Sequence, residues 1–432
     1  MKYARPKGTF DILPQAIKGE DRWKEAERWH HLELTMRTLA QEYAYREIRT
    51  PIFEQTELFA REIGETSDIV FKEMYTFLDK SGRSMSLRPE GTAPVMRAFA
   101  QNQLQQLGNL HKFFYVGPFF RYDRPQAGRY RQLHQFGIEA IGNKDPEQDF
   151  EAIKLLYELY SRLGISNLQI VVNSVGDRPS RSKYKEVLLD FLRPHLTSLS
   201  KENQARFTDN PLRMLDSKGQ EEPLLLEKAP SILDFISPEG MAHFDSLCAL
   251  LKQQQIPFSI DPYLVRGLDY YNGPVFEIIS EALEGAQNTI GAGGRYDGLL
   301  TAVGGPSLPC VGGSTGIERI LHTMEGQCIP FPERQEPFVT IISLGRAAKG
   351  RVFALLYELR HKKVPSEMVV TEKIQKALRL ASKNHSSLAI IIGEEELSRD
   401  CAQVKAIKSR TMKEVALSGL IEYVIGELNH GL

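Results

Sequence analysis

Two neighbouring stretches between residues 112 and 142 carry the clearest pattern of apolar and polar positions in the chain. In the first, residues 113–120, aromatic and other apolar residues predominate, and the run ends at Arg121. In the second, apolar residues alternate with polar ones at positions 133, 136, 138 and 141. A loop bounded by Pro125 and Gly128 separates the two stretches. The pattern predicts two antiparallel strands joined by this loop.

The segments around this strand pair predict helices mixed with short strands. Apolar residues recur at three- and four-residue spacing between residues 20 and 43, which is typical of an amphipathic helix. Pro51 prevents the helix from continuing. The further expected elements are a strand at 47–53, a hairpin at 71–87, helices at 95–107 and 147–163, and a strand at 168–173.

The second half of the chain divides by composition and periodicity. Residues 177–257 are helix-rich, charged and interrupted by prolines, which we interpret as an insertion. The pattern then predicts strands at 258–264 and 275–279, a glycine-dense stretch at 291–316, and a helix at 316–324. Residues 326–337 contain three prolines and predict a linker. Strands and helices alternate from residue 338 to 428, which favours a separate α/β domain over residues 338–432.

Composition adds few constraints on function. The 432 residues carry 54 Lys and Arg against 55 Asp and Glu, so any contact with a polyanion must come from a local patch. Residues 336–432 carry 15 Lys and Arg against 11 Asp and Glu, which is equally consistent with a polyanion-facing domain and with scattered solvated charges. The four cysteines lie far apart, so neither a disulfide framework nor a metal site made of Cys and His is expected. These features, and the absence of long apolar runs, predict a cytoplasmic protein.

Charged side chains gather in and around the predicted strand pair. Arg121 and three further arginines fall within eleven residues, and Gln135 and Glu139 lie four apart, so both point to the same face of the second strand. Arginines that bind a polyanion would then lie beside a carboxylate that could bind a cation. The alternative is a half-buried hairpin with a solvated basic loop. Glu90 and Thr92 precede the helix at 95–107 and can equally be residues that cap it.

Two glycine-containing stretches resemble nucleotide-binding motifs but do not complete them. Residues 345–350 resemble the first half of a P-loop, but Arg351 and Val352 follow where the Lys and the Ser or Thr should stand. In residues 291–296, Tyr296 occupies the place of the last glycine of a dinucleotide fingerprint. A nucleotide would therefore be bound on an antiparallel scaffold by arginines.

Taken together, these stretches resemble the class II aminoacyl-tRNA synthetases, and specifically the histidyl-tRNA synthetase family of the bacterial type. Pro51 and its flanks resemble motif 1, residues 120–139 motif 2, and residues 316–319 motif 3. LVRGLDYYNGPVFE (264–277) and GAGGRYDGL (291–299) resemble the two histidine-specific signatures. The resemblance implies an α+β fold in which residues 1–325 form the class II antiparallel sheet flanked by helices, with the helical insertion. A linker at 326–337 and an α/β anticodon-binding domain at 338–432 would follow.

The same resemblance implies a ligase that activates L-histidine with ATP to histidyl-adenylate and then charges tRNA(His). Arg121 would bind the α-phosphate, Arg266 would be an additional catalytic arginine on the other side of it, and Arg319 would hold the γ-phosphate. Mg²⁺ would be bound with the ATP phosphates. Arginine suits these roles because its planar fork stays charged and binds phosphate oxygens bidentately. Motif 1 further implies a homodimer.

The remaining site residues also follow from the resemblance. Those expected to bind the α-amino group are Glu90, Thr92 and Gln135; those expected at the imidazole are Glu139 and Tyr271; and the histidine site would further include Arg266 and Tyr270. Adenine would lie against Asp123 and Leu133, which depart from the Glu and the aromatic residue usual in the family. The acceptor end of the tRNA would approach Arg124, Gln126 and Arg129.

Three alternatives share parts of this pattern. The first is a histidine-binding paralogue, the regulatory subunit of ATP phosphoribosyltransferase, which normally lacks the anticodon domain and the signature containing Arg266 and Tyr271. The second is a synthetase-like RNA-binding or sensor module that has lost activation; it is disfavoured by the presence of all three arginines. The third is a class II synthetase for another amino acid, which the two histidine signatures disfavour.

Overall fold

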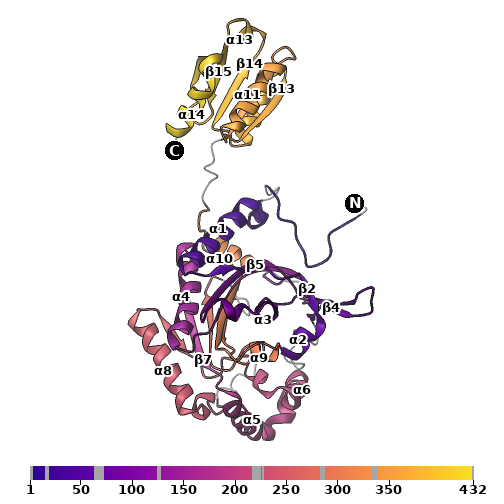
Figure 1. Cartoon of the computed structure of the whole chain (residues 1–432), viewed down its shortest axis with the longest axis vertical. Helices are drawn as coiled ribbons and strands as arrows, with labels where there is room; N and C mark the ends of the chain where they lie inside the picture. The colour runs from indigo at the N-terminus through magenta and orange to yellow at the C-terminus, as the bar shows by residue number, and fades with distance from the viewer. Residues whose placement is uncertain are drawn as a thin grey trace. The chain divides into compact units, whose positions relative to one another are not determined.

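The chain forms two compact units, residues 1–331 and 332–432, in this computed structural model (Figure 1). The structure describes residues 3–14, 19–62, 73–123, 128–216, 225, 228–282, 288–331 and 338–430. The loop residues Arg124, Pro125 and Gln126, and residues 332–337 of the expected linker, lie outside these ranges. No helix in the described ranges combines the length and apolar character needed to cross a bilayer.

An eight-stranded sheet organises the first unit, and its order is β1-β5-β6-β11-β10-β9-β7-β8. Neighbouring strands are antiparallel except at the two edges, where β1 pairs with β5 and β8 with β7 in parallel. The strands are β1 (Arg46–Glu47), β5 (His111–Phe120), β6 (Gln132–Ile141), β7 (Leu168–Ser174), β8 (Phe258–Ile260), β9 (Pro274–Ser280), β10 (Thr289–Arg295) and β11 (Cys310–Gly316). The predicted strand pair is β5 and β6, paired from His111 opposite Ile141 to Phe120 opposite Gln132. The predicted fold class is confirmed.

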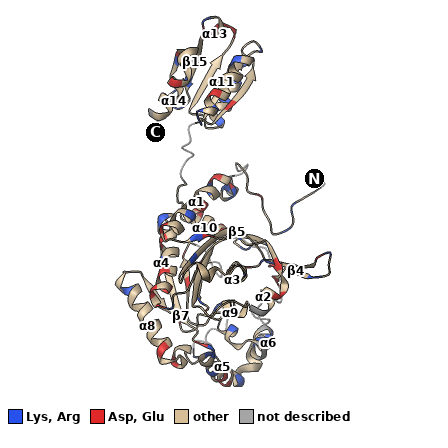
Figure 2. Ribbon diagram, in the orientation of Figure 1, with Lys and Arg blue, Asp and Glu red and all other residues tan. Residues whose placement is uncertain are grey.

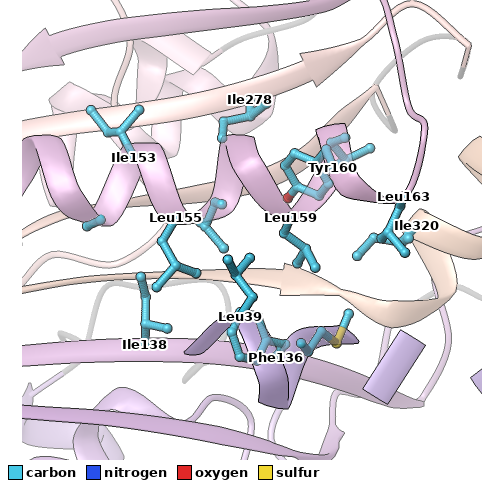
Figure 3. Packing of buried hydrophobic residues seen from close by; sticks show 14 of the residues in the cluster. Leu39, Phe136, Ile138, Ile153, Leu155, Leu159, Tyr160, Leu163, Ile278 and Ile320 are labelled. Carbon is cyan, nitrogen blue, oxygen red and sulfur yellow. The ribbon is translucent and has the colours of Figure 1, made fainter. Parts of the chain in front are cut away.

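Helices cover one face of this sheet and form the main core with it. They are α1 (Ala26–Glu42), α4 (Pro146–Arg162) and α10 (Ile317–Gly326), preceded by the 3-10 helix η1 (Gly19–Lys24). Leu155 and Leu159 of α4 pack with Phe136 and Ile138 of β6 in a fully buried cluster (Figure 3). Alternation along β6 therefore sends Phe136 and Ile138 toward the helices and places Gln135 and Glu139 on the opposite face.

The insertion consists of helices, as predicted. Its elements are α5 (Arg178–Leu192), η4 (Arg193–Ser198), α6 (Lys201–Asp209), η5 (Pro211–Asp216), η6 (Ile232–Phe235) and α8 (Pro238–Gln253). Asp177 caps α5 by accepting a hydrogen bond from the backbone of Ser180, and Pro179 lies within the first turn of this helix. In Figure 1, α8 runs beside α4.

A smaller three-stranded sheet lies before β5. It has the order β2-β4-β3 and consists of β2 (Phe53–Gln55), β3 (Thr76–Leu78) and β4 (Ser84–Leu87), with α2 (Thr56–Glu62) following β2. The strand predicted at 47–53 is thus wrong, because β1 and β2 belong to different sheets. Between them the buried guanidinium of Arg88 donates to the backbone oxygen of Thr50 at 3.0 Å and to that of Pro118 at 3.0 Å. Arg88 therefore connects the segment around Pro51 to β5.

Two predicted elements have different bounds in the structure. The helix expected at 95–107 is α3 (Thr92–Gln101), followed by the 3-10 turn η3 (Leu104–Leu107). It begins earlier because Glu90 caps its first turn, and it ends before Gln103, whose φ of 51° is left-handed. The strand expected at 258–264 ends at Ile260, since Pro262 cannot donate to a ladder. A short helix, α9 (Leu299–Ala302), follows β10.

The second unit has its own five-stranded sheet, with the order β13-β12-β14-β15-β16. The strands are β12 (Val339–Leu344), β13 (Ser366–Thr371), β14 (Leu388–Ile392), β15 (Cys401–Ala406) and β16 (Met412–Ala416). The helices are α11 (Lys349–His361), α12 (Ile374–Lys383), α13 (Glu394–Ser398) and α14 (Leu420–His430), with the turn η8 (Leu417–Gly419). Helix α11 buries Val352 and Leu355 against Ile341 and Ile390. Figure 2 shows residues of both charge signs on the helices of each unit.

A buried ion pair joins α4 to the end of β10. The Arg295 guanidinium, 4% exposed, donates through Nε and Nη2 to the Asp149 carboxylate, which also contacts His243 Nε2 of α8 at 3.0 Å. Burial alone would lower the pKa of Arg295, but the Asp149 carboxylate raises it overall. The pair fixes α4 and α8 against the strand that leads into Tyr296.

We expect Arg295→Ala to lower the free energy of unfolding of the first unit by about 3–5 kcal/mol, because it leaves Asp149 as a buried carboxylate without its main partner. Both tryptophans, Trp23 and Trp29, lie in this unit, so urea unfolding followed by tryptophan fluorescence reports on it. The control is Arg193→Ala, whose exposed pair with Asp190 should contribute less than about 1 kcal/mol. Equal effects of the two substitutions would contradict a structural role for the buried pair.

Candidate active site

A cavity of about 470 Å³ opens on the face of the large sheet opposite α4 and collects most of the predicted site residues. Those that line it are Glu90, Thr92, Arg121, Asp123, Arg129, Leu133, Gln135, Arg266, Tyr270, Tyr271 and Arg319. Glu139 lies directly behind this lining, bonded to Thr92 and Tyr296. Arg124 and Gln126 fall outside the described residues.

The carboxylate of Glu139 is the centre of a buried hydrogen-bond network. It is 1% exposed and accepts from the Thr92 hydroxyl at 2.7 Å and from the Tyr296 hydroxyl. The Tyr115 hydroxyl lies 3.4 Å from the oxygen that Thr92 binds. Tyr296 is also in edge contact with the rings of Tyr270 and Tyr271. The network therefore joins β5, β6, the start of α3 and the residue that follows β10.

Burial raises the pKa of Glu139 to about 8, although the hydroxyls of Tyr296 and Thr92 act in the opposite direction. Glu90 adds a further increase, because its negative charge lies nearby. A carboxyl group with this pKa can gain or lose a proton near neutral pH. A cationic or hydrogen-bond-donating ligand group would favour its charged form.

Glycines make room for this network. Gly312 of β11 pairs with Glu139, and a Cβ at this position would overlap both the carboxylate and the Tyr296 hydroxyl. In the same way, a Cβ at Gly91 or at Gly137 would overlap the ring of Tyr115. Gly312, in the glycine-dense stretch, and Gly91 and Gly137 outside it thus each leave space that a side chain of the site occupies.

Glu90 has a local structural role as well as a place in the cavity wall. Its carboxylate accepts from the backbone N–H groups of Thr92 at 2.6 Å and Ala93 at 2.9 Å. The alternative interpretation of Glu90 as a helix cap is therefore confirmed. Burial raises the pKa of Glu90, while the two backbone donors and the charge of Arg121 counteract part of this increase. A carboxylate fixed in this way still presents its charge to the cavity.

Four of the arginines that line the cavity converge. Burial lowers the pKa of Arg319, and the positive charges of Arg129, Arg121 and Arg266 lower it further. Grouped cations repel each other, so a bound polyanion would stabilise them. The arrangement has the charge expected of a site for a nucleotide triphosphate.

Two strands orient two of these arginines through one chain of contacts. Arg266 Nη1 donates to Glu277 of β9, and the other Glu277 oxygen accepts from the Thr289 hydroxyl of β10 at 2.8 Å. The backbone oxygen of Thr289 accepts from Arg319 Nη1 at 2.5 Å. Arg121 is held separately, by a 2.9 Å bond from its Nε to the backbone oxygen of Pro89.

Asp123 and Arg129 were assigned different roles by resemblance, but the structure brings them together. Arg129 Nη1 lies 3.2 Å from Asp123 Oδ2. Asp123 and Leu133 both line the cavity, which is the location expected of residues that contact a ligand. The pair would have to separate if each group is to contact a different ligand.

Several residues at the site were missed by the sequence analysis: Tyr115, Glu277, Thr289 and Tyr296. Tyr296 lies within the second signature, so that motif was an available signal for it. Glu318 of motif 3 was also left without a role; buried, it accepts from His134 through both the backbone N–H, at 2.8 Å, and the ring Nδ1, at 2.9 Å. This contact fixes α10, and hence Arg319, against β6.

Family models and relatives cover both units of the chain. The model described as Histidyl-tRNA synthetase matches residues 23–320, and the one described as Anticodon binding domain matches residues 339–427. A protein of Protochlamydia amoebophila (strain UWE25) named Histidine--tRNA ligase is 52% identical, with 95% of this chain and 96% of its own length covered. A protein of the same name from Desulforamulus reducens is 44% identical, with 98% and 99% covered.

A solved structure agrees with these matches. It is titled as the crystal structure of apo S. aureus histidyl-tRNA synthetase. It has a TM-score of 0.81 and 34% sequence identity to this chain, and the match covers 98% of this chain and 99% of the other.

The pKa of Glu139 predicts how Glu139→Gln changes stability with pH. Because the folded protein binds this proton more tightly than the unfolded chain, whose Glu titrates near ~4.3, its free energy of unfolding falls as pH rises from about 4.3 to 8. Gln does not titrate. The variant should therefore gain stability relative to the wild type, by up to ~1.4 kcal/mol per pH unit, and the difference should level off above pH 8.

Urea unfolding between pH 5.5 and 9, followed by tryptophan fluorescence, measures this difference. The exposed Glu239 of α8 provides the control, since Glu239→Gln should show a difference from the wild type that hardly changes with pH. A flat difference for Glu139→Gln would show that Glu139 titrates as an ordinary carboxyl group.

Proposed function

The chain belongs to the histidyl-tRNA synthetase family, and we propose that the cavity beside Glu139 binds L-histidine and ATP for the first step of its reaction. The function is that of a histidine–tRNA ligase. It activates L-histidine with ATP, forming histidyl-adenylate and pyrophosphate, and then transfers histidine to the 3′ end of tRNA(His). The observation that carries the proposal is that one cavity brings the buried carboxylates of Glu90 and Glu139 together with the four converging arginines.

Adenylate formation requires two anions to meet. A carboxylate oxygen of histidine attacks the α-phosphorus of ATP in line with the leaving pyrophosphate, so the bond to the bridging oxygen breaks as the new P–O bond forms. We assign Arg121 and Arg266 to the α-phosphate and Arg319 to the γ-phosphate. Their fixed guanidinium groups would reduce repulsion between the reactants and stabilise the charge that develops in the transition state.

We further propose that Mg²⁺ binds with the ATP phosphates and neutralises part of their charge. The described residues include no group of three His, Cys, Asp or Glu side chains placed to hold a metal ion. The carboxylates of Glu277 and Asp123 are already paired with Arg266 and Arg129. The proposal therefore assigns the metal to ATP rather than to protein ligands.

Histidine would bind with its side chain toward Glu139. Glu139 and Tyr271 would contact the imidazole, Tyr270 would close the pocket beside them, and the α-amino group would contact Glu90, Thr92 and Gln135. A side chain of similar size without ring nitrogens would leave Glu139 buried and without its ligand partner. Mismatches of this kind can give discrimination of about 10⁴ to 10⁵ without editing.

The tRNA would contact both units. We propose that Arg129, with Arg124 and Gln126, meets the acceptor end. Asp123 and Leu133 would contact adenine. We assign residues 1–325 to catalysis, 326–337 to a linker, and 338–432 to binding the anticodon.

The four cysteines are unpaired thiols, which supports a reducing, cytoplasmic location.

The test is histidine-dependent exchange of labelled pyrophosphate into ATP, run with purified full-length protein and Mg²⁺ against all twenty amino acids without tRNA. We expect exchange with histidine alone. Arg266→Ala should lower it by about 10² to 10³-fold, since one donor to the transition state is lost, while Arg193→Ala should leave it unchanged. Histidine binding without exchange would instead indicate a regulatory or sensor protein, and near-normal exchange by Arg266→Ala would remove Arg266 from the mechanism.

We also propose a homodimer, in which the smaller sheet contributes to the interface. Phe53 and Leu78 are 51% and 70% exposed there, and the ring of Phe53 lies 6.4 Å from that of Phe77, which is 44% exposed. Neighbouring exposed apolar side chains of this kind are typical of interaction surfaces.

Sedimentation equilibrium should therefore give twice the chain mass of 49.0 kDa for the wild type. Phe53→Glu combined with Phe77→Glu should shift the protein toward the monomer, because two charges would have to be buried at the interface. Met412→Glu, at an exposed position of the second unit, is the control. A monomeric wild type at micromolar concentration would contradict the dimer.

A further inference from the structure

The loop of residues 264–273 carries Arg266, Tyr270 and Tyr271, yet it contains no helix or strand of its own. It joins β8 to β9, so its shape depends on contacts made by other parts of the chain. Backbone oxygens in such a loop need hydrogen-bond donors from outside it. The identity of these donors decides how rigidly Arg266 is presented to the cavity.

Several donors come from the insertion, the part of the chain to which the proposed function assigns no role. Arg213 Nη2 donates to the backbone oxygen of Gly267 at 3.0 Å. Asn210 Nδ2 lies 3.1 and 3.3 Å from the two carboxylate oxygens of Asp269. Arg181 Nη1 of α5 donates to the backbone oxygen of Asp269 at 3.1 Å. The insertion therefore contacts Gly267, which directly follows Arg266, and Asp269, which directly precedes Tyr270.

The local structure of η5 explains why Asn210 and Arg213 act together. Pro211 begins this 3-10 helix, and the backbone N–H of Arg213 donates to the backbone oxygen of Asn210 at 3.1 Å. Asn210 immediately precedes this helix, at the end of α6. The hydrogen bonds of both side chains reach the loop, and Arg213 also lines the cavity.

The guanidinium of Arg213 lies beside Gly267. A Cβ on Gly267 would lie 3.4 Å from Arg213 Nη1, which is an ordinary van der Waals contact. On the other side of Arg266, its Nη1 donates to Glu277. The insertion thus holds the backbone next to Arg266, while the sheet holds its guanidinium.

We propose that Arg213 and Asn210 are positioning residues for adenylate formation, through which the insertion fixes the loop so that Arg266 meets the α-phosphate. This inference rests on the proposed function of the cavity. Neither residue need touch a substrate; the effect passes through Arg266. A displacement of about 1 Å in a catalytic group can cost up to ~10²-fold in rate.

The experiment uses the full-length protein and the histidine-dependent pyrophosphate exchange assay. Arg213→Met keeps most of the side-chain volume but removes the donor to Gly267, and we expect its kcat to fall roughly 10- to 100-fold. The KM for histidine should rise less than kcat falls, since Glu90, Thr92 and Glu139 keep their contacts while only Tyr270 and Tyr271 belong to this loop. Arg213→Lys, which can still donate, should recover part of the loss. Arg193→Met, at an exposed position of the same insertion, should match the wild type.

A double variant separates positioning from a merely structural effect. If Arg213 acts through Arg266, then Arg213→Met combined with Arg266→Ala should be no slower than Arg266→Ala alone. Multiplied losses in the double variant would overturn the proposal, as would a kcat of Arg213→Met within twofold of the wild type. If Arg213→Met fails to fold, Asn210→Ala takes its place, with the same expected fall in kcat and the same overturning result.

The activity of the wild type distinguishes a failure of the proposed function from a failure of the positioning role. A wild-type protein without histidine-dependent exchange overturns the proposed function, and the positioning role that rests on it. Exchange by the wild type together with normal kcat in Arg213→Met and Asn210→Ala overturns the positioning role alone.

Discussion

The register of β6 between β5 and β11 determines which side chains meet in the cavity. Pairing runs without interruption from His111 opposite Ile141 to Phe120 opposite Gln132 on one side, and from Cys310 opposite Ile141 to Gly316 opposite Gln135 on the other. Because side chains alternate along a strand, a slip of one residue would turn Phe136 and Ile138 away from the α4 core. The same slip would bury Gln135 and Glu139 among apolar residues. The packing of the core and the contacts of the site therefore require the same register, and a slip would disrupt both.

Charges of both signs lie in and around one cavity. Burial raises the pKa of Glu90 and of Glu139, and the positive charges of Arg121, Arg129 and Arg266 lower the pKa of Arg319. The buried carboxylates and the neighbouring arginines are therefore electrostatically unfavourable when no ligand is bound. Ligands that relieve this cost stabilise the folded protein as they bind. A group that is cationic or donates hydrogen bonds would relieve it at the carboxylates, and an anionic group would relieve it at the arginines.

The sequence predicted the strands and their faces better than the contacts between distant segments. Alternation along residues 133–141 correctly placed Gln135 and Glu139 on one face, because that face depends only on local geometry. Tyr296 is 157 residues from Glu139, and its role depends on β10 and β11 lying beside β6, which periodicity does not specify. The strand expected at 47–53 failed for a related reason, since nothing local indicates that two sheets divide it. The steric role of the glycines facing Tyr115 and Glu139 likewise depends on residues that are distant in the sequence.

Hydrogen bonds to backbone oxygens orient arginines of the cavity, and each bond uses only one of the five N–H donors of a guanidinium. Arg121 binds the backbone oxygen of Pro89 through Nε, and Arg319 binds that of Thr289 through Nη1. A guanidinium has five N–H donors in one plane, so a single bond fixes the plane while other donors remain directed along it. A lysine ammonium bound to the same carbonyl would keep its charge but could still rotate about its stem, and it would offer no fork to two phosphate oxygens. These arginines are therefore aligned before ATP binds, and aligning them adds no free-energy cost during the reaction.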